Sequence, residues 1–292
     1  MTTQDPKTER TPGQAVDFPI DTHMHTWFSH DSSVALELYA AQAAAYGIAE
    51  IAITDHVDFM PDSAGYRYFD YDERRRYIQE AAERWAGKVV IHHGVEITYE
   101  SRFEAEIGEY MREHPFDYSI GSVHAVSDSP YARDRIATFV TGKNVAEAVA
   151  PYFAEVERAI RSGYFDTVGH LDQCKRWLRP WFKPADFATI PQAYEPLLVA
   201  LVETGTALEV NSSGLRYPER ETYPGPWVVA RFHELGGKRV TVGSDAHMPQ
   251  SFAFGLEEAA EIVAAAGFDR LSLQRAVDRG DLVLPERFHR GG

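Results

Sequence analysis

One structural unit recurs seven times along the chain. A short β-rich run is followed by polar residues able to carry out chemistry, and then by a longer helix-like stretch. The runs are Val16–Ile20, Ile48–Thr54, Val89–Val95, Tyr118–Val123, Phe165–Gly169, Ala207–Val210 and Val240–Gly243. Strands that alternate with helices form a parallel sheet. Seven consecutive units in 292 residues favour one closed or nearly closed α/β barrel over two separate domains.

The segments between the runs have the apolar spacing of helices. The expected helices are Ser33–Tyr46, Asp70–Trp85, Asn144–Ser162, Ala185–Thr204 and Gly255–Ala266. Ser32 or Ser33 is suited to cap the first helix, and Gly47 is suited to end it. Because Pro191 and Pro196 interrupt the fourth helix, we expect a kink or two separate pieces there.

No change in composition marks a linker, so we expect a single barrel domain over residues 16–285, with short tails at 1–15 and 286–292. The polar first residues contain no apolar signal-peptide core. No apolar run is long enough to span a membrane. These features predict a cytoplasmic protein with no membrane partner.

The charge and the cysteine content exclude several classes of function. The 29 basic and 44 acidic residues give a formal charge of −15, which argues against a non-specific nucleic-acid binder. A small phosphorylated substrate remains possible, because it experiences only the local field of its pocket. The single cysteine, Cys174, excludes a disulfide framework and a multi-cysteine zinc site.

Histidines and acids gather where the predicted strands end. In a parallel barrel these ends open on one face, so residues far apart in sequence converge there. His23 and His25 share a face of the first strand by their i, i+2 spacing, and Asp245 and His247 repeat that spacing. The full set at these positions is His23, His25, His30, His56, Glu96, His124, His170, Asp245 and His247.

A lone histidine of this kind is more often a structural residue than a ligand, and a lone H-x-H pair is ambiguous. Their joint placement at successive strand ends favours a metal site, because imidazole and carboxylate are the ligands of Zn, Fe and Mn. Glu96 follows an apolar strand, where a charge is costly unless it is paired or metal-bound. Asp21 and Asp55 precede ligand candidates and either orient imidazoles or serve as turn or cap residues.

Basic residues are few near these strand ends. Arg216 follows Asn-Ser-Ser-Gly-Leu after the sixth strand, and Lys175 and Arg176 follow His170-Leu-Asp. An arginine beside a metal site suits bidentate capture of phosphate. We therefore predict that Arg216, Lys175 and Arg176 bind substrate; the alternative for each is a surface salt bridge.

The ordered motifs resemble those of the PHP (polymerase and histidinol phosphatase) superfamily. They are Asp21-Thr-His-Met-His-Thr26, Thr54-Asp-His56, Gly94-Val-Glu96, Gly121-Ser-Val-His124, Gly169-His170 and Gly243-Ser-Asp-Ala-His247. Within that superfamily, Glu209-Val-Asn-Ser-Ser-Gly-Leu-Arg216 and Gly169-His-Leu-Asp-Gln-Cys-Lys-Arg176 look like the monofunctional histidinol-phosphate phosphatases. The resemblance implies a single-domain, distorted (β/α)7 TIM-like barrel.

The resemblance also implies two or three divalent metal ions: Zn, Fe or Mn. One ion would be held by His23, His25, Glu96 and Asp245, a second by Glu96, His124 and His170, and a third by His30, His56 and His247. The segment Ser29-His30-Asp31 departs from the usual pattern, because either His30 or Asp31 could serve as the ligand. We select His30.

The implied activity is a phosphoric monoester hydrolase that converts L-histidinol phosphate to L-histidinol and phosphate, a step of histidine biosynthesis. Hydroxide held between metals would attack phosphorus, and Glu96, Asp245, His247 and Arg216 would form the catalytic set. Three enzyme alternatives remain: a broad-specificity phosphatase, a phosphodiesterase of the same superfamily, and an amidohydrolase-like enzyme. A non-catalytic metal-binding protein is a further alternative.

Overall fold

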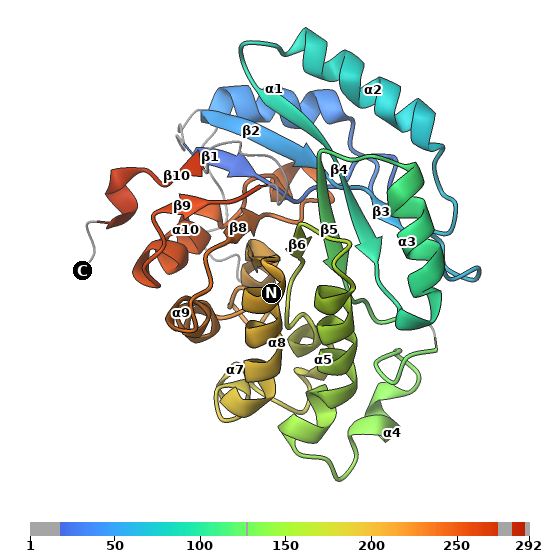
Figure 1. The fold of residues 1–292 in the computed structure, drawn as a ribbon, viewed down its shortest axis with the longest axis vertical. Helices are drawn as coiled ribbons and strands as arrows, with labels where there is room; N and C mark the ends of the chain where they lie inside the picture. Colours follow the sequence, from blue (N-terminus) through green and yellow to red (C-terminus); the bar gives the residue numbers. More distant parts are fainter. Residues whose placement is uncertain (1–17, 127, 274–281, 290–292) are drawn as a thin grey trace, which may run out of the picture.

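Seven parallel strands follow one another in chain order around a barrel in the computed structural model, which describes residues 18–126, 128–273 and 282–289 (Figure 1). They are β1 (Phe18–Asp21), β2 (Ile48–Ile53), β4 (Val90–Thr98), β5 (Tyr118–Ser122), β6 (Thr167–Val168), β7 (Ala207–Asn211) and β8 (Val240–Gly243). The two-residue strand β3 (His56–Val57) pairs with the distal half of β4, where His56 lies opposite Glu96. The predicted barrel is therefore confirmed.

Backbone hydrogen bonds link the last strand to the first and bring the barrel close to closure. Thr22 N–H donates to Val242 O at 3.1 Å, and Asp245 N–H donates to His23 O at 2.8 Å. Met24 and Ala246 form a parallel bridge just beyond the strands. The ends of β1 and β8, each carrying two predicted ligands, are thereby held side by side.

Ten helices lie around the strands within the described residues (Figure 1). They are α1 (Leu36–Tyr46), α2 (Tyr71–Arg84), α3 (Glu104–Glu113), α4 (Ile136–Val140), α5 (Val145–Ser162), α6 (Cys174–Leu178), α7 (Pro184–Phe187), α8 (Pro191–Thr204), α9 (Pro226–Glu234) and α10 (Leu256–Ala265). A short antiparallel pair, β9 (Arg270–Leu271) and β10 (Leu282–Val283), follows the barrel. Among the described residues, no helix combines the length and the apolar character needed to cross a membrane.

Of the two caps predicted for α1, the C-terminal one is confirmed and the N-terminal one is wrong. Gly47 ends the helix in the left-handed conformation, with φ of 73°, as predicted. The helix begins at Leu36 rather than Ser33, and neither serine caps it, because its N-cap is Ala35 without a side-chain bond. Ser32 Oγ donates instead to the carbonyl oxygens of His25 and His247. The serine therefore joins the loops after β1 and β8.

The prolines divide the fourth expected helix as predicted. α7 ends at Phe187, and α8 begins at Pro191. Proline is tolerated in the first turn because the N–H groups there have no hydrogen-bond partner within the helix. Pro196 is tolerated inside α8. Helices α3, α4, α6 and α9 were not among the expected helices.

The expected tails are only partly described. Residues 1–15 and 290–292 lie outside the described residues. Residues Glu286–His289 form a 3-10 turn, and the Phe288 ring packs edge-on against Phe18 at a centroid distance of 5.9 Å. The first part of the predicted C-terminal tail thus packs against the barrel.

A fully buried arginine joins α2 to the barrel wall. Arg74 Nε donates to Asp55 Oδ2 at 2.7 Å, and Arg74 Nη2 donates to the carbonyls of Ile53 and Gly94. Asp55 has no exposed surface either. The guanidinium therefore compensates a buried carboxylate directly after β2 while binding β2 and β4 together.

We predict that Arg74→Met lowers the free energy of unfolding of the metal-free protein by about 3–5 kcal/mol, because it leaves the Asp55 carboxylate buried without its partner. Arg84→Met on the same helix removes the half-exposed pair with Glu37 and should cost less than about 1 kcal/mol. Urea unfolding curves of the two variants provide the comparison. Equal losses would mean that the buried pair contributes no more than a surface pair.

Candidate metal centre

The Glu96 carboxylate is the centre of the predicted site. It is 1% exposed near the end of β4 and is surrounded by imidazoles from four other strand ends. Its Oε2 atom lies 3.2 Å from His23 Nε2 and 2.9 Å from His56 Nδ1, and its Oε1 atom lies 3.0 Å from His170 Nε2. His25 Nε2 and His124 Nε2 lie at 3.4 and 3.5 Å.

A first group of ligand atoms joins the ends of β1 and β8. Potential ligand atoms of His23, His25 and Asp245 all lie within 4.8 Å of one another. Asp245 Oδ1 is 3.8 Å from His23 Nε2 and 3.6 Å from His25 Nε2. The strand ends thus bring together residues more than 200 positions apart.

A second group lies on the β3, β4 and β5 side. It contains His56, Glu96 and His124, whose ligand atoms meet the same distance limit. His170 adjoins this group through its contact with Glu96, and the His124 and His170 ring centroids are 5.0 Å apart. Glu96 therefore stands between the first and the second group, as a bridging ligand must.

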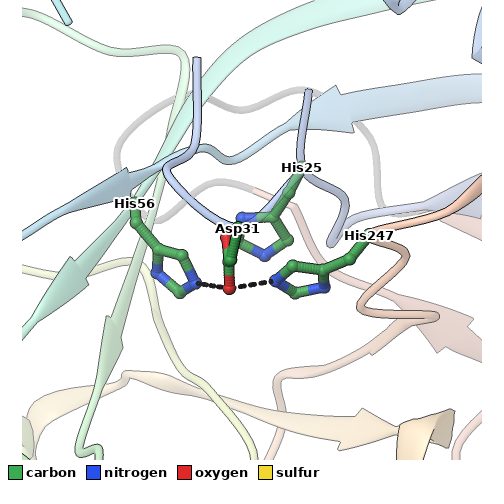
Figure 2. A group of neighbouring side chains, drawn as sticks. All are labelled: His25, Asp31, His56 and His247. Atoms are coloured by element: carbon green, nitrogen blue, oxygen red, sulfur yellow. Dashed lines mark ion pairs between the residues drawn. The ribbon is translucent and has the colours of Figure 1, made fainter. Parts of the chain in front are cut away.

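Figure 2 shows the third group, in which three imidazoles surround the Asp31 carboxylate. Asp31 Oδ2 lies 3.1 Å from His247 Nε2 and 3.6 Å from His56 Nε2. His25 stacks on His247 with centroids 4.0 Å apart and completes the group. Since His25 and His56 also belong to the other two groups, the three groups form one continuous centre.

The structure places Asp31, and not His30, in this third group. His30 is exposed, and its ring centroid lies 5.6 Å from that of His56 and 6.2 Å from that of Tyr68. It belongs to no ligand group formed by the described residues. The alternation that predicts which strand residues face inward does not extend into the turn after β1, so sequence could not choose between these neighbours.

Buried polar atoms without partners test whether metal ions fit this centre. Among the described residues, His23 Nε2, His25 Nε2 and Glu96 Oε2 are buried and have no partner with hydrogen-bond geometry. Leaving such atoms unsatisfied costs free energy. Imidazole nitrogens and carboxylate oxygens that face one another in this way are a donor set for divalent cations. The residues therefore fit a metal centre.

The pKa shifts of the two carboxylates and of His25 have the direction that metal binding requires. Burial alone would raise the pKa values of Glu96 and Asp245, but nearby histidines, His23 first among them, hold both well below their ordinary values. Burial, followed by repulsion from His247 and His56, lowers the pKa of His25 to about 3. The carboxylates are therefore charged at neutral pH, and His25 keeps a free lone pair.

The pKa values of His23 and His56 shift in the opposite direction to that of His25. Burial lowers both, but the carboxylates beside these rings raise them well above their ordinary values: Glu209 and Glu96 at His23, and Glu96 and Asp31 at His56. A metal ion would therefore displace a proton from each of these rings.

The two aspartates that precede ligands have different roles. Asp55 Oδ1 accepts from Thr26 N–H at 2.5 Å and from Ser29 Oγ at 3.3 Å, and Ser29 Oγ lies 3.0 Å from His25 Nδ1. Asp55 thus orients an imidazole through a serine. Asp21 accepts from backbone N–H groups, including that of Ser244 at 2.9 Å, and so supports the chain rather than a ring.

Glu209, a β7 residue with no exposed surface, was not among the predicted site residues, although it begins one of the motifs. Its Oε1 atom lies 2.7 Å from His23 Nδ1, and its Oε2 atom accepts from the His170 backbone N–H at 2.7 Å. The signal was the same as for Glu96, namely an acid within an apolar run. Thr98 is a smaller omission: its hydroxyl lies 2.9 Å from His124 Nδ1.

The three basic residues predicted to bind substrate have partners within the protein. Arg216 Nη1 and Nη2 donate to the carbonyls of Ser244 and Asp245, at 2.7 and 2.9 Å. Lys175 is buried between Asp172 at 2.7 Å and Glu221 at 2.6 Å. Arg176 lies over the Tyr217 ring, 4.0 Å from its centroid. Two guanidinium nitrogens of Arg216 thus support the Asp245 backbone.

The PHP domain model matches residues 21–213, about two thirds of the chain. The chain belongs to the PHP domain family. The match begins at the H-x-H strand and ends beyond β7, so it covers the strands that carry every proposed ligand except Asp245 and His247.

Curated relatives and a solved structure resemble most of the chain. It is 28% identical to the histidinol-phosphatase of Lactococcus lactis subsp. lactis, covering 87% of this chain and 93% of the relative. It is also 28% identical to a protein of Thermotoga maritima named as a probable histidinol-phosphatase, covering 90% and 97%. The crystal structure of the L. lactis histidinol phosphate phosphatase, in complex with zinc, L-histidinol and phosphate, has a TM-score of 0.76 at 27% identity and covers 88% of this chain and 96% of its own.

We predict that Glu96→Gln loses at least one bound metal ion without unfolding the barrel. Glutamine keeps the size of the side chain but removes the charge shared between the first and second groups. Zinc content after dialysis and far-UV circular dichroism measure the two effects. Glu83→Gln, at an exposed glutamate on α2, is the matched control and should retain full zinc. Full occupancy in Glu96→Gln would exclude a bridging role.

Adjacent substitutions distinguish the two candidates for the third group. Asp31→Asn removes the carboxylate between His56 and His247 and should therefore weaken zinc binding. Loss of a group that only orients a ligand lowers metal affinity roughly 10–100-fold, and we expect loss of this carboxylate to lower it by at least as much. His30→Asn should leave affinity within about twofold of the unmodified protein. Chelator competition measures both constants. The opposite order of effects would restore His30 as the ligand.

Proposed function

We propose that this protein is a metal-dependent phosphomonoesterase that hydrolyses L-histidinol phosphate to L-histidinol and phosphate. The observation that carries the proposal is the continuous centre of three ligand groups, which are joined by the shared residues His25 and His56 and by the contacts of Glu96 with His23 and His25. The likeness over most of the chain to an enzyme crystallised with L-histidinol and phosphate supports this substrate. The reaction would supply a step of histidine biosynthesis.

Each proposed metal ion has a defined set of residues. His23, His25, Glu96 and Asp245 would hold one ion, and Glu96, His124 and His170 would hold a second. Asp31, His56 and His247 would hold a third, in contact with His25. Zn, Fe and Mn all accept such ligands. Bound ions would neutralise the phosphate oxygens and make water acidic enough to act as a nucleophile near neutral pH.

The protein's own residues leave one side of the centre open to substrate. A cavity of about 430 Å³ is lined by Asp31, His56, Asp58, Thr98 and His124, among others. Asp31 and His247 have 40% and 27% of their side chains exposed, whereas His23 and His25 have none. A phosphate ester would therefore approach from the third group, with Asp31 at the rim of the cavity and the buried Glu96 behind His56 and His124.

The positive charge that phosphate needs would come mainly from the metal ions. Lys175 is neutralised by two carboxylates, and Arg176 is stacked on a tyrosine. Arg216 uses two of its nitrogens on the carbonyls of Ser244 and Asp245, so we propose that it acts in catalysis by holding Asp245 in place. Direct contact of Arg216 with phosphate stays a prediction.

A substrate panel tests the proposed function. Zinc-loaded protein should hydrolyse L-histidinol phosphate with a higher kcat/KM than sugar phosphates, nucleoside monophosphates or p-nitrophenyl phosphate. It should act poorly on bis(p-nitrophenyl) phosphate, because a diester lacks the second negative charge that several cations stabilise. Phosphate or p-nitrophenol release gives the rates. Equal rates on all monoesters would indicate a broad-specificity phosphatase, and preference for the diester would overturn the proposal.

A further inference from the structure

We infer that Glu209 is a positioning residue that sets two metal-ligand groups at once: one carboxylate oxygen fixes the tautomer of His23, and the other fixes the backbone at His170. The side chain projects from β7 toward β1 and β6 and has no exposed surface. It does not belong to the ligand groups formed by the described residues, so it acts through the residues that its oxygens contact: His23, His170 and Asn211, whose Nδ2 donates to Oε2 at 3.0 Å.

The contact with His23 determines which ring nitrogen carries the proton. A carboxylate oxygen accepts a hydrogen bond from an imidazole N–H. Because Glu209 Oε1 lies 2.7 Å from His23 Nδ1, the hydrogen must be on Nδ1. A metal ion would then bind through the lone pair of Nε2, the atom that lies 3.2 Å from Glu96 Oε2 and has no partner with hydrogen-bond geometry among the described residues. Glu209 thus selects the tautomer that can bind a metal.

The contact with His170 holds a strained part of the backbone. His170 has a φ of 24°, a region that residues other than glycine rarely adopt. Its N–H donates to Glu209 Oε2 at 2.7 Å, and its ring places Nε2 3.0 Å from Glu96 Oε1. The same carboxylate therefore positions an imidazole on each side of Glu96.

An amide cannot make both contacts. Glutamine at this position has one acceptor oxygen, whereas His23 Nδ1–H and the His170 N–H both need an acceptor. If the glutamine NH2 group faced the His170 N–H, two donors would meet. If the NH2 group faced His23 Nδ1, the His23 proton would have to lie on Nε2, where it would point into the centre. In either orientation one of the two ligand groups is disturbed.

Zinc affinity tests this role against a matched control. Glu50→Gln also removes a carboxylate from a histidine, because Glu50 Oε2 lies 2.6 Å from His92 Nε2, but neither residue belongs to the centre. By chelator competition, Glu209→Gln should bind at least one equivalent of zinc roughly 10–100-fold more weakly than the unmodified protein. Glu50→Gln should stay within about twofold. Equal affinities of the two variants would overturn the inference.

Nitrogen NMR of the zinc-loaded, unmodified protein gives a second readout that does not depend on whether Glu209→Gln folds. The His23 ring should carry its proton on Nδ1, and a proton on Nε2 would overturn the inference. The inference rests on the metal centre of the proposed function. Neither measurement uses a phosphate ester, so failure to hydrolyse histidinol phosphate would refute the proposed substrate and leave this inference standing.

Discussion

The burial of one carboxylate among imidazoles is the constraint on which the rest of the centre depends. Glu96 has five histidines within 3.5 Å and almost no contact with solvent. A charge in such a place is stable only if cations or protonated partners surround it. The parallel barrel supplies these partners, because each strand ends on the same face and delivers one or two of them.

Around this centre lies a second layer of polar groups that hold the ligands in position. Asp55 reaches His25 through Ser29 and is itself paired with Arg74, while Asp21 supports the backbone at Ser244. These contacts are buried, so each gains strength from the low dielectric and would be costly to leave incomplete. The positions of the proposed metal ligands therefore depend on contacts from helix α2 and from the end of β8, as well as on the strands that carry the ligands.

The sequence could predict those parts that follow from strand periodicity and chain order. The seven strands and the placement of His23, His25, Glu96 and Asp245 at one face follow directly from it. Periodicity fails in turns, and this is why Asp31 could not be separated from His30.

Long-range pairing is the other limit. The partners of Glu209, Arg216 and Lys175 lie on elements distant in sequence, and only the fold shows which charged groups neutralise one another. Helices of five residues, such as α4 and α6, carry too few turns for a clear apolar repeat.

The junction between β1 and β8 has a consequence for how the protein is made. Thr22 and Val242 are separated by 220 positions, and Asp21 and Ser244 by 223. During translation, the H-x-H segment therefore leaves the ribosome more than 200 residues before Asp245 does. The first ligand group cannot form on a nascent chain until Asp245 has emerged, so in the proposed centre this group could take up a cation only after all the barrel strands have been synthesised.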